Sequence, residues 1–170
     1  MNLSEANTTY LEMNSPCEFI EKPGSSGLDI IEAEINEYKF NRYLYSLVGE
    51  AWGWTDKLAL SDECWQEYAE SSDLRTWVAY FKGSIAGYFE LRSNSNLNVE
   101  IAYFGLAPKF IGKGFGAHLL SSAITFAWEK CNARRIWVHT CTLDHPNALS
   151  NYQSRGLKIY HEETTVPNNI

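Results

Sequence analysis

Three strand-like runs follow one another closely in the middle of the chain, and their short connections limit the folds open to it. Alternating and β-branched residues predict strands over 76–81, 84–92 and 98–106. Lys82-Gly83 and residues 93–96 join them, and connections this short make antiparallel hairpins. An amphipathic helix is predicted over 114–131 and a strand, apolar enough to be buried on both faces, over 135–141. A strand that follows such a crossover helix returns parallel.

The flanking segments predict further helices and strands. A strand over 28–34 precedes a helix whose apolar residues, from Phe40 to Val48, recur at i, i+3 and i+4, and which Gly49 closes. Ser61 is the expected N-cap of a second helix that ends near 71–72. Pro146 opens a short helix that Gly156 ends, before a last strand over 157–165. We therefore expect an α+β fold: a mixed, mostly antiparallel central sheet with helices on both faces.

The length suits one domain with a single core. The chain has 170 residues, and a two-domain enzyme is not expected at this length. We expect an N-terminal arm over 1–27 that holds at most one short strand, at 8–13, and lies on the domain. The domain itself is expected over 28–165, followed by a polar tail over 166–170.

Charge and cysteine usage exclude several function classes. Lys and Arg number 14 against 21 Asp and Glu, a net charge of −7, so nucleic acids and anionic membranes are poor partners. The widely spaced cysteines form no CxxC pair, and we expect them to be reduced core thiols of a cytoplasmic protein: Cys17, Cys64, Cys131 and Cys141. The four histidines complete no ligand set at familiar spacing, so no metal is expected, and His139 is expected in the core.

A glycine-rich segment between a predicted strand and the long helix is the most informative feature for function. Gly112, Gly114 and Gly116 free the backbone amides to approach a phosphate at the positive end of that helix. The alternative is a turn that only joins the two elements. The dinucleotide fingerprint places its third glycine one residue later, and the triphosphate loop requires Ser or Thr after Gly-Lys, so neither matches.

Residues Ile111 to Gly116 resemble the pyrophosphate loop of the GNAT superfamily, which transfers acyl groups from acyl-CoA to amines. That loop reads Gln or Arg, x, x, Gly, x, Gly or Ala, so Ile111 stands where a polar residue is usual. The resemblance covers roughly 28–160 and agrees with the element order. It implies a binding site for acetyl-CoA, the expected co-substrate, formed by Phe104, Gly105, Leu106, Ile111, Gly112, Lys113, Gly114, Phe115, Gly116 and Ala117.

Glu100 is the candidate general base. An alkylamine with a pKa of about 10.4 is almost fully protonated at neutral pH, so acyl transfer to it requires a proton acceptor. Glu100 lies in the middle of a predicted strand, 14 positions before Gly114, an offset shared by the catalytic glutamate of several members of the resembled family. Regular alternation would place it on the face of Ala102 and Phe104. The alternative is a glutamate that faces solvent.

Tyr152 is the candidate acid. The family's helix Asn-x-x-Ala-x-x-x-Tyr-x-x-x-Gly-Phe is matched at Ala148, Tyr152 and Gly156, while His145 replaces the asparagine. The resemblance thus implies that Tyr152 protonates the departing CoA thiolate; the alternative is a core tyrosine. Because a thiolate of pKa near 8.5 already leaves readily, the acid should contribute less than the base.

The acceptor is the least constrained part of the prediction. By resemblance, the first two helices and their connecting loop wall the acceptor site, where Tyr43, Trp52 and Trp54 could contact an apolar or cationic amine. Aromatic packing under a long loop explains the same residues. We expect direct transfer of an acyl group, acetyl above all, to a primary amine of a small molecule or peptide. The alternative is a non-catalytic acyl-CoA-binding or sensory module. A homodimer is compatible with either.

Overall fold

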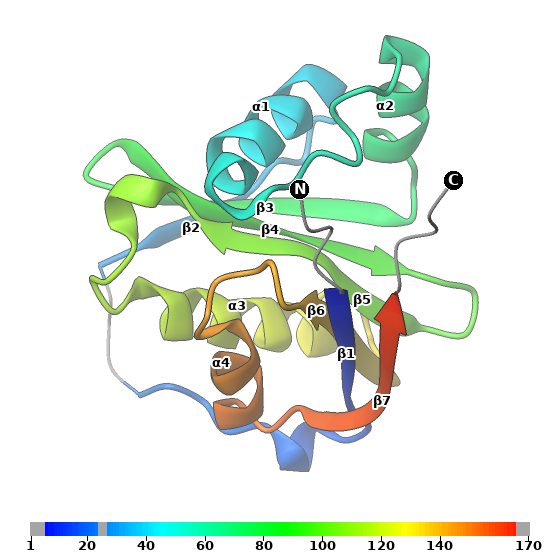
Figure 1. Ribbon diagram of the computed structural model, residues 1–170, viewed down its shortest axis with the longest axis vertical. Coiled ribbons are helices and arrows are strands. Elements are labelled where there is room, and N and C mark those ends of the chain that lie inside the picture. Colours follow the sequence, from blue (N-terminus) through cyan, green and yellow to red (C-terminus); the bar gives the residue numbers. More distant parts are fainter. Residues whose placement is uncertain (1–5, 24–26, 166–170) are drawn as a thin grey trace.

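The computed structural model describes residues 6–23 and 27–165, and its centre is a sheet of seven strands (Figure 1). The strand order is β2-β3-β4-β5-β6-β1-β7. Among the described residues, β5 and β6 pair in parallel and every other neighbouring pair is antiparallel, which confirms the predicted mixed sheet. The strands are β1 (Ala6–Met13), β2 (Asp29–Glu32), β3 (Leu74–Phe81), β4 (Ser84–Ser93), β5 (Asn98–Leu106), β6 (Arg135–Cys141) and β7 (Lys158–Thr165).

Helices cover both faces of the sheet, as predicted (Figure 1). One layer consists of α1 (Tyr38–Gly49) and α2 (Asp62–Ala69), and the opposite layer of α3 (Phe115–Glu129) and α4 (Ala148–Ser154). The Ser61 hydroxyl accepts the Cys64 N–H at 3.3 Å and so caps α2. Helix α4 begins two residues later than Pro146, because the His145 Nδ1 accepts the Asn147 N–H at 3.0 Å and holds these residues in a turn.

The N-terminal strand is an interior strand of the sheet. Residues 1–27 were expected to form an arm on the domain, yet β1 hydrogen-bonds to β6 on one side and to β7 on the other. Leu11 and Met13 are fully buried in the main core cluster. Residues 6–13 therefore belong to the sheet, whereas the expected tail, 166–170, lies outside the described residues.

The two faces of the sheet bury different types of side chain. On the α3 side, an almost purely apolar row of helix residues is fully buried, namely Leu119, Leu120, Ala123, Ile124 and Ala127. On the α1 side, Leu44 and Val48 pack on Val78 and Tyr88. Next to them the Glu90 carboxylate, 1% exposed, accepts hydrogen bonds from Asn41 Nδ2 and the Tyr68 hydroxyl. The polar groups are therefore concentrated on the α1–α2 face.

Three burial predictions were wrong. Strand β6 alternates rather than burying both faces: Ile136, Val138 and Thr140 are buried, and His139 is exposed. The exposure of alternate residues follows because helices cover only one face of the sheet at β6 and β1 (Figure 1). All four cysteines are free, but Cys17 and Cys64 are exposed rather than in the core.

A β-bulge at Ala102 reverses the alternation of β5. Tyr103 lies opposite Glu90 and Ile101 lies opposite Leu91, which leaves Ala102 as the extra residue. Glu100 therefore shares the α1–α2 face with Tyr103. The prediction that it would share a face with Phe104 was wrong, since Phe104 packs on the main core on the α3 side, and a two-residue period cannot anticipate an inserted residue.

Candidate active site

Strands β5 and β6 diverge and leave one edge of β5 open. Their parallel pairing covers Asn98 to Glu100 of β5 and ends where Glu100 lies beside Trp137. From Ile101 to Leu106, β5 remains paired with β4 on its other side. In the described part of the chain, the edge of this segment that faces β6 has no strand partner. Main-chain N–H and C=O groups on such an edge are available to an extended ligand.

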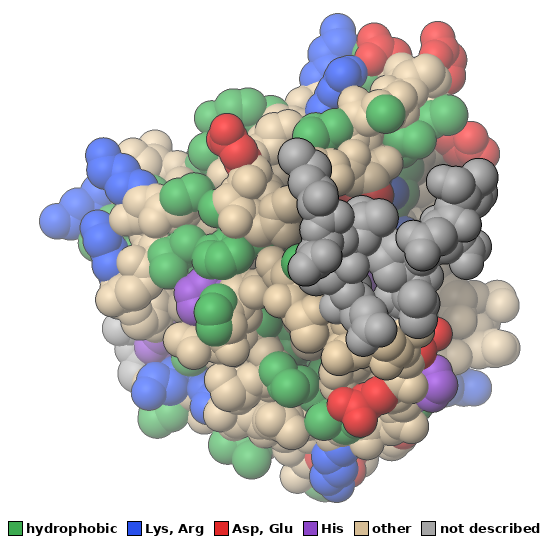
Figure 2. All heavy atoms as spheres, viewed as in Figure 1, with side chains coloured by type: hydrophobic (Ala, Val, Ile, Leu, Met, Phe, Trp, Pro, Cys, Tyr) green, Lys and Arg blue, Asp and Glu red, His purple; other side chains and the backbone are tan. Residues whose placement is uncertain are grey.

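A cavity of about 850 Å³ occupies this divergence. Figure 2 shows hydrophobic side chains on this face of the molecule, below α1 and above α4. Five parts of the chain form most of the lining of the cavity: Ile101–Leu106 of β5; Ile111, Gly112, Gly114, Gly116 and Ala117; Asn147, Asn151 and Tyr152 at α4; Thr8, Tyr10, His139 and Cys141 on β1 and β6; and Trp52, Gly53, Trp54 and Asp56 after α1. A cavity of this size and mixed lining suits a small organic ligand.

The N-terminus of α3 opens onto the cavity without a side-chain cap. Gly114 is the N-cap residue, with φ of +80°, and no side chain accepts from the first turn. Gly112 has φ of +78°, and a Cβ at either position would meet no atom within 4 Å. Glycine is therefore required here by backbone conformation rather than by space. The uncapped N–H groups and the helix dipole together suit an anion such as a diphosphate.

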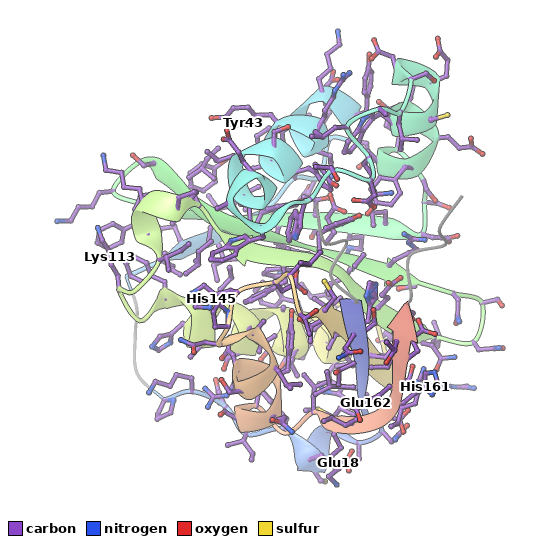
Figure 3. The ribbon with its side chains drawn as sticks, viewed as in Figure 1. Glu18, Tyr43, Lys113, His145, His161 and Glu162 are labelled. Carbon is purple, nitrogen blue, oxygen red and sulfur yellow. The ribbon has the colours of Figure 1, made fainter. Side chains whose placement is uncertain are left out.

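Most of the predicted cofactor residues line the cavity. Phe104, Gly105, Leu106, Ile111, Gly112, Gly114, Gly116 and Ala117 do so. Lys113 does not line it: its Nζ lies 5.4 Å from the Phe110 ring centroid, at the outer edge of the loop (Figure 3). Phe115 is only 7% exposed and packs on Phe81, with ring centroids 4.9 Å apart. A ligand in the cavity would therefore meet the main chain of this loop rather than the side chains of Lys113 and Phe115.

Gly105 serves close packing as well as the open edge. A Cβ there would lie 2.5 Å from Val48 Cγ1 of α1, and a Cβ at Gly87 would lie 2.4 Å from the Gly105 carbonyl oxygen. The irregularity of β5 lies at Ala102 rather than at Gly105. Glycine at position 105 thus lets α1 approach the strand that forms the floor of the cavity.

Tyr152 brings a protonated hydroxyl to the cavity. It is 6% exposed, and its ring lies 6.1 Å from that of Phe104. Burial, and secondarily the charge of Asp144, raises the pKa of Tyr152 above that of a free phenol. The hydroxyl therefore remains protonated at neutral pH and can act as a donor.

Glu100 lies beside the cavity rather than in its lining. Its side chain is 15% exposed, and its Oε2 is 3.9 Å from Arg92 Nε. The carboxylate is also among the charges that act on Lys57, next to Asp56 of the lining. Glu100 thus stands at the border of the cavity, on the side of α1 and α2.

The predicted acceptor residues separate into two groups. Trp52 and Trp54 line the cavity, and the Trp52 ring meets the His145 ring edge-on at 4.9 Å. Tyr43 is 54% exposed on the outer side of α1 and does not line the cavity (Figure 3).

Sequence reasoning missed Asp56 and Tyr103, which also line the cavity. The Tyr103 hydroxyl donates to Asp56 at 3.2 Å. Asp56 lies in a loop without periodicity. Tyr103 was assigned no role because the bulge that determines its face leaves no mark in the sequence.

Two cationic side chains also line the cavity and fit a phosphorylated ligand. Lys22 is held next to α3, where its N–H donates to the Ser121 hydroxyl at 2.9 Å, and Arg155 follows α4. The Arg155 Nε and Nη1 are buried, and no described residue accepts a hydrogen bond from them. A partly buried guanidinium without an anionic partner is costly in the free protein and favours an anion nearby.

The described residues contain neither a cluster of metal ligands nor a helix suited to span a membrane. No group of three or more His, Cys, Asp or Glu side chains there is arranged to hold a metal ion. No described helix combines the length and the apolar character needed to span a bilayer.

Comparison with known proteins identifies the family. The model of the acetyltransferase (GNAT) family matches residues 41–157. The chain therefore belongs to the GNAT acetyltransferase family. A search of curated proteins gave no match.

Solved structures share the fold. An acetyltransferase from Bacillus subtilis in complex with CoA is 28% identical, with a TM-score of 0.60, over 79% of this chain and 78% of that one. The spermidine N-acetyltransferase of Vibrio cholerae in complex with CoA and spermine is 22% identical, with a TM-score of 0.62, over 78% and 81%. A GCN5-related N-acetyltransferase from Sphaerobacter thermophilus has a TM-score of 0.69 at 13% identity, covering 94% of this chain. This chain spans about half the length of that protein, 50%, and 54% of a related one from Kribbella flavida.

Proposed function

We propose that this protein transfers an acyl group, with acetyl as the expected one, from acyl-CoA to a primary amine of a small molecule or peptide. The observation that carries the proposal is the placement of an uncapped helix N-terminus and an open strand edge on one cavity. The first suits the diphosphate of CoA and the second suits its amide-containing pantetheine arm. The B. subtilis structure with CoA, at 28% identity, supports the same donor.

In this proposal the donor lies along β5. The N–H groups from Gly112 to Ala117 hold the diphosphate, and Lys22 and Arg155 supply positive charge to its phosphates. The main chain of Phe104, Gly105 and Leu106 aligns the pantetheine arm. A main-chain amide of this edge also polarises the thioester carbonyl, which makes its carbon more electrophilic.

The proposed reaction proceeds directly between two bound substrates. The acceptor amine nitrogen attacks the thioester carbon, the C–N bond forms and the C–S bond breaks. Glu100 takes the proton of the amine, directly or through a water molecule, and Tyr152 gives its proton to the CoA thiolate. Holding both reactants in one cavity supplies much of the acceleration, so no covalent acyl-enzyme is required.

The acceptor side of the proposal rests on the cavity wall formed by Trp52 and Trp54. Aromatic walls favour apolar or cationic amines. Two structural neighbours carry the names of a spermidine N-acetyltransferase and an aminoglycoside acetyltransferase. Spermidine and an aminoglycoside are therefore the first acceptors to assay.

The test combines donor binding with turnover. We expect CoA to raise the melting temperature, as a ligand of the folded state must. We also expect thiol release from acetyl-CoA when a panel of primary amines is added. Stabilisation by CoA without thiol release for any amine or any acyl-CoA of the panel would favour the non-catalytic acyl-CoA-binding module. Absence of both would refute the proposed donor site.

A further inference from the structure

Three aromatic rings cluster at the α1–α2 end of the cavity, and two of them hydrogen-bond to one carboxylate. The ring centroids of Tyr45, Trp54 and Tyr103 lie 5.5 Å (Tyr45 to Trp54), 5.2 Å (Tyr45 to Tyr103) and 5.0 Å (Trp54 to Tyr103) apart. The hydroxyls of Tyr45 and Tyr103 both donate to Asp56, one to each carboxylate oxygen. Trp54, Asp56 and Tyr103 also line the cavity, so this arrangement faces the space in which a ligand would bind.

The two tyrosines hold the Asp56 carboxylate in place. Burial, together with the charge of Asp56, raises the pKa of both Tyr45 and Tyr103, so both phenols stay protonated and continue to donate. Asp56 is exposed, and after accepting these two bonds each of its oxygens retains a free lone pair.

We propose that Asp56, Trp54 and Tyr103 form a subsite for a second, positively charged group of the acceptor, separate from the amine that is acylated. The inference rests on the proposed function and refines it: the preferred acceptors are diamines and related polycations rather than neutral monoamines. An alkylammonium would place its charge on the Asp56 carboxylate and its CH₂ groups against the faces of Trp54 and Tyr103.

Tyr103 relates this subsite to the place of acyl transfer. Its main chain belongs to the open edge of β5, and its hydroxyl reaches Asp56 at 3.2 Å. The subsite therefore lies about one tyrosine side chain away from the strand edge that aligns the thioester. The carbon chain of 1,4-diaminobutane is of comparable length, which makes this diamine the natural probe.

The neighbouring lysine does not neutralise the subsite from within the cavity. Lys57 is absent from the cavity lining, and its Nζ lies 3.8 Å from the Tyr68 ring centroid and 5.8 Å from that of Tyr103. Asp56 is the strongest of the negative charges that act on Lys57, and Glu90 and Glu100 act on the same lysine. Of these side chains, Asp56 is the one that lines the cavity.

The experiment compares 1,4-diaminobutane with butan-1-amine in the wild type and in the Asp56→Asn variant, with acetyl-CoA as donor. We expect the wild type to prefer the diamine by about tenfold in kcat/KM, the size expected of one charge-assisted contact. Asp56→Asn keeps the shape of the side chain and should lower kcat/KM for the diamine much more than kcat/KM for butan-1-amine, so that most of the preference is lost. Glu67→Gln, the same charge change at an exposed position of α2, should leave the preference intact.

A wild type that acylates both amines equally well, or an Asp56→Asn variant that retains the preference, would overturn the subsite while leaving acyl transfer itself intact. If no amine is acylated, calorimetric titration of the CoA-bound wild type with 1,4-diaminobutane decides instead. Binding that is lost in Asp56→Asn supports the subsite, and no binding refutes it.

If Asp56→Asn does not fold, the salt dependence of the wild type replaces it. Salt should raise KM for the diamine more than KM for the monoamine. Equal responses would overturn the proposal.

Discussion

The two ends of the cavity are built on different principles. At the α3 end, the groups that face the cavity are mainly backbone groups and glycines, supported by an apolar helix face. At the α1–α2 end, they are side chains: Trp52, Trp54, Asp56 and Tyr103, backed by the buried Glu90 with Asn41 and Tyr68. A site made of main chain requires only that the backbone have the right shape. A site made of side chains depends on each residue.

This difference explains which end a sequence motif can reveal. The α3 end is called the donor end here because the proposed function places acyl-CoA there, and the α1–α2 end is called the acceptor end. The positive φ values at Gly112 and Gly114 restrict the residue type, so the donor end has a recognisable sequence pattern. The α1–α2 end is where the proposed function places the acceptor. Its residues come from α1, a loop and β5, in an order that no short motif contains. The experiments below test the contrast, starting with the largest expected effect.

The apolar support of the donor end should be intolerant of truncation. Leu11 on β1 is fully buried in the main core, so Leu11→Ala should reduce the free energy of unfolding by about 2–5 kcal/mol. Chemical denaturation measures this. Ile20, 57% exposed just after β1, provides the control, and Ile20→Ala should change stability by less than about 0.5 kcal/mol. Similar losses in the two variants would show that β1 is not part of the core.

Glu100, the proposed base, should be the most important side chain for turnover at neutral pH. Glu100→Gln should lower kcat about a hundredfold near pH 7, with a smaller loss at higher pH, where more of the acceptor amine is already unprotonated. A pH profile of kcat for both proteins measures this.

The control for Glu100 is its neighbour. Arg92→Met breaks the 3.9 Å contact between Arg92 and Glu100 but keeps the carboxylate, and kcat should remain within about threefold. A variant Glu100→Gln that matches the wild type across the pH range would exclude Glu100 as the base.

The donor end should respond to backbone strain in its glycine loop. Gly114→Ala introduces a Cβ at φ of +80° and should cost about 1 kcal/mol of stability. It should also weaken CoA binding about tenfold, because the first amides of α3 would shift.

Gly83→Ala is a matched control, since Gly83 has φ of +82° with the same open surroundings but lies in the turn between β3 and β4. It should lose similar stability and keep its affinity for CoA, as measured by calorimetry. Equal affinities in the two variants would remove the loop from the donor site.

The smallest effect concerns the pH dependence of stability at the acceptor end. Burial raises the pKa of Glu90 above its unfolded value, so the folded protein binds the proton more tightly between the two values. Stability from this group is therefore fully present below the unfolded pKa, about 4.3, and is lost as pH rises through the window up to the folded pKa.

Glu90→Gln should flatten this slope, which is at most about 1.4 kcal/mol per pH unit. Denaturation at a series of pH values measures it, and Glu67→Gln, exposed on α2, should retain the slope of the wild type. Identical slopes in Glu90→Gln and the wild type would show that Glu90 does not cause this pH dependence of stability.

Local patterns predicted most of the elements, because local physical chemistry specifies them. The apolar period of α1, the cap at Ser61 and the short turn at Lys82-Gly83 all appear in the structure where the sequence indicates. The loop glycines were likewise recognisable, since their backbone conformations restrict the residue type.

What escaped prediction depends on contacts between distant segments. The position of β1 between β6 and β7 is decided by pairing partners over a hundred residues away: Leu11, for instance, lies opposite Val138 of β6 and Ile159 of β7. The bulge at Ala102 changes the faces of Glu100 and Tyr103 without any unusual residue type. The hydrogen bond between Tyr103 and Asp56 depends on this bulge and on a loop without periodicity, so it was not accessible from sequence.

The insertion of β1 between two late strands has a consequence for biosynthesis. While a ribosome is still translating the middle of the chain, the segment that will become β1 has neither of its neighbours and must wait, unpaired, until β6 emerges. The half of the sheet from β2 to β5 pairs in the order of the chain, with hairpins joining β3 to β4 and β4 to β5, and can assemble earlier. The pairing of β1 with β6 and β7 is thus the late step of folding. A nascent chain stalled before β6 would expose Leu11 and Met13 to chaperones.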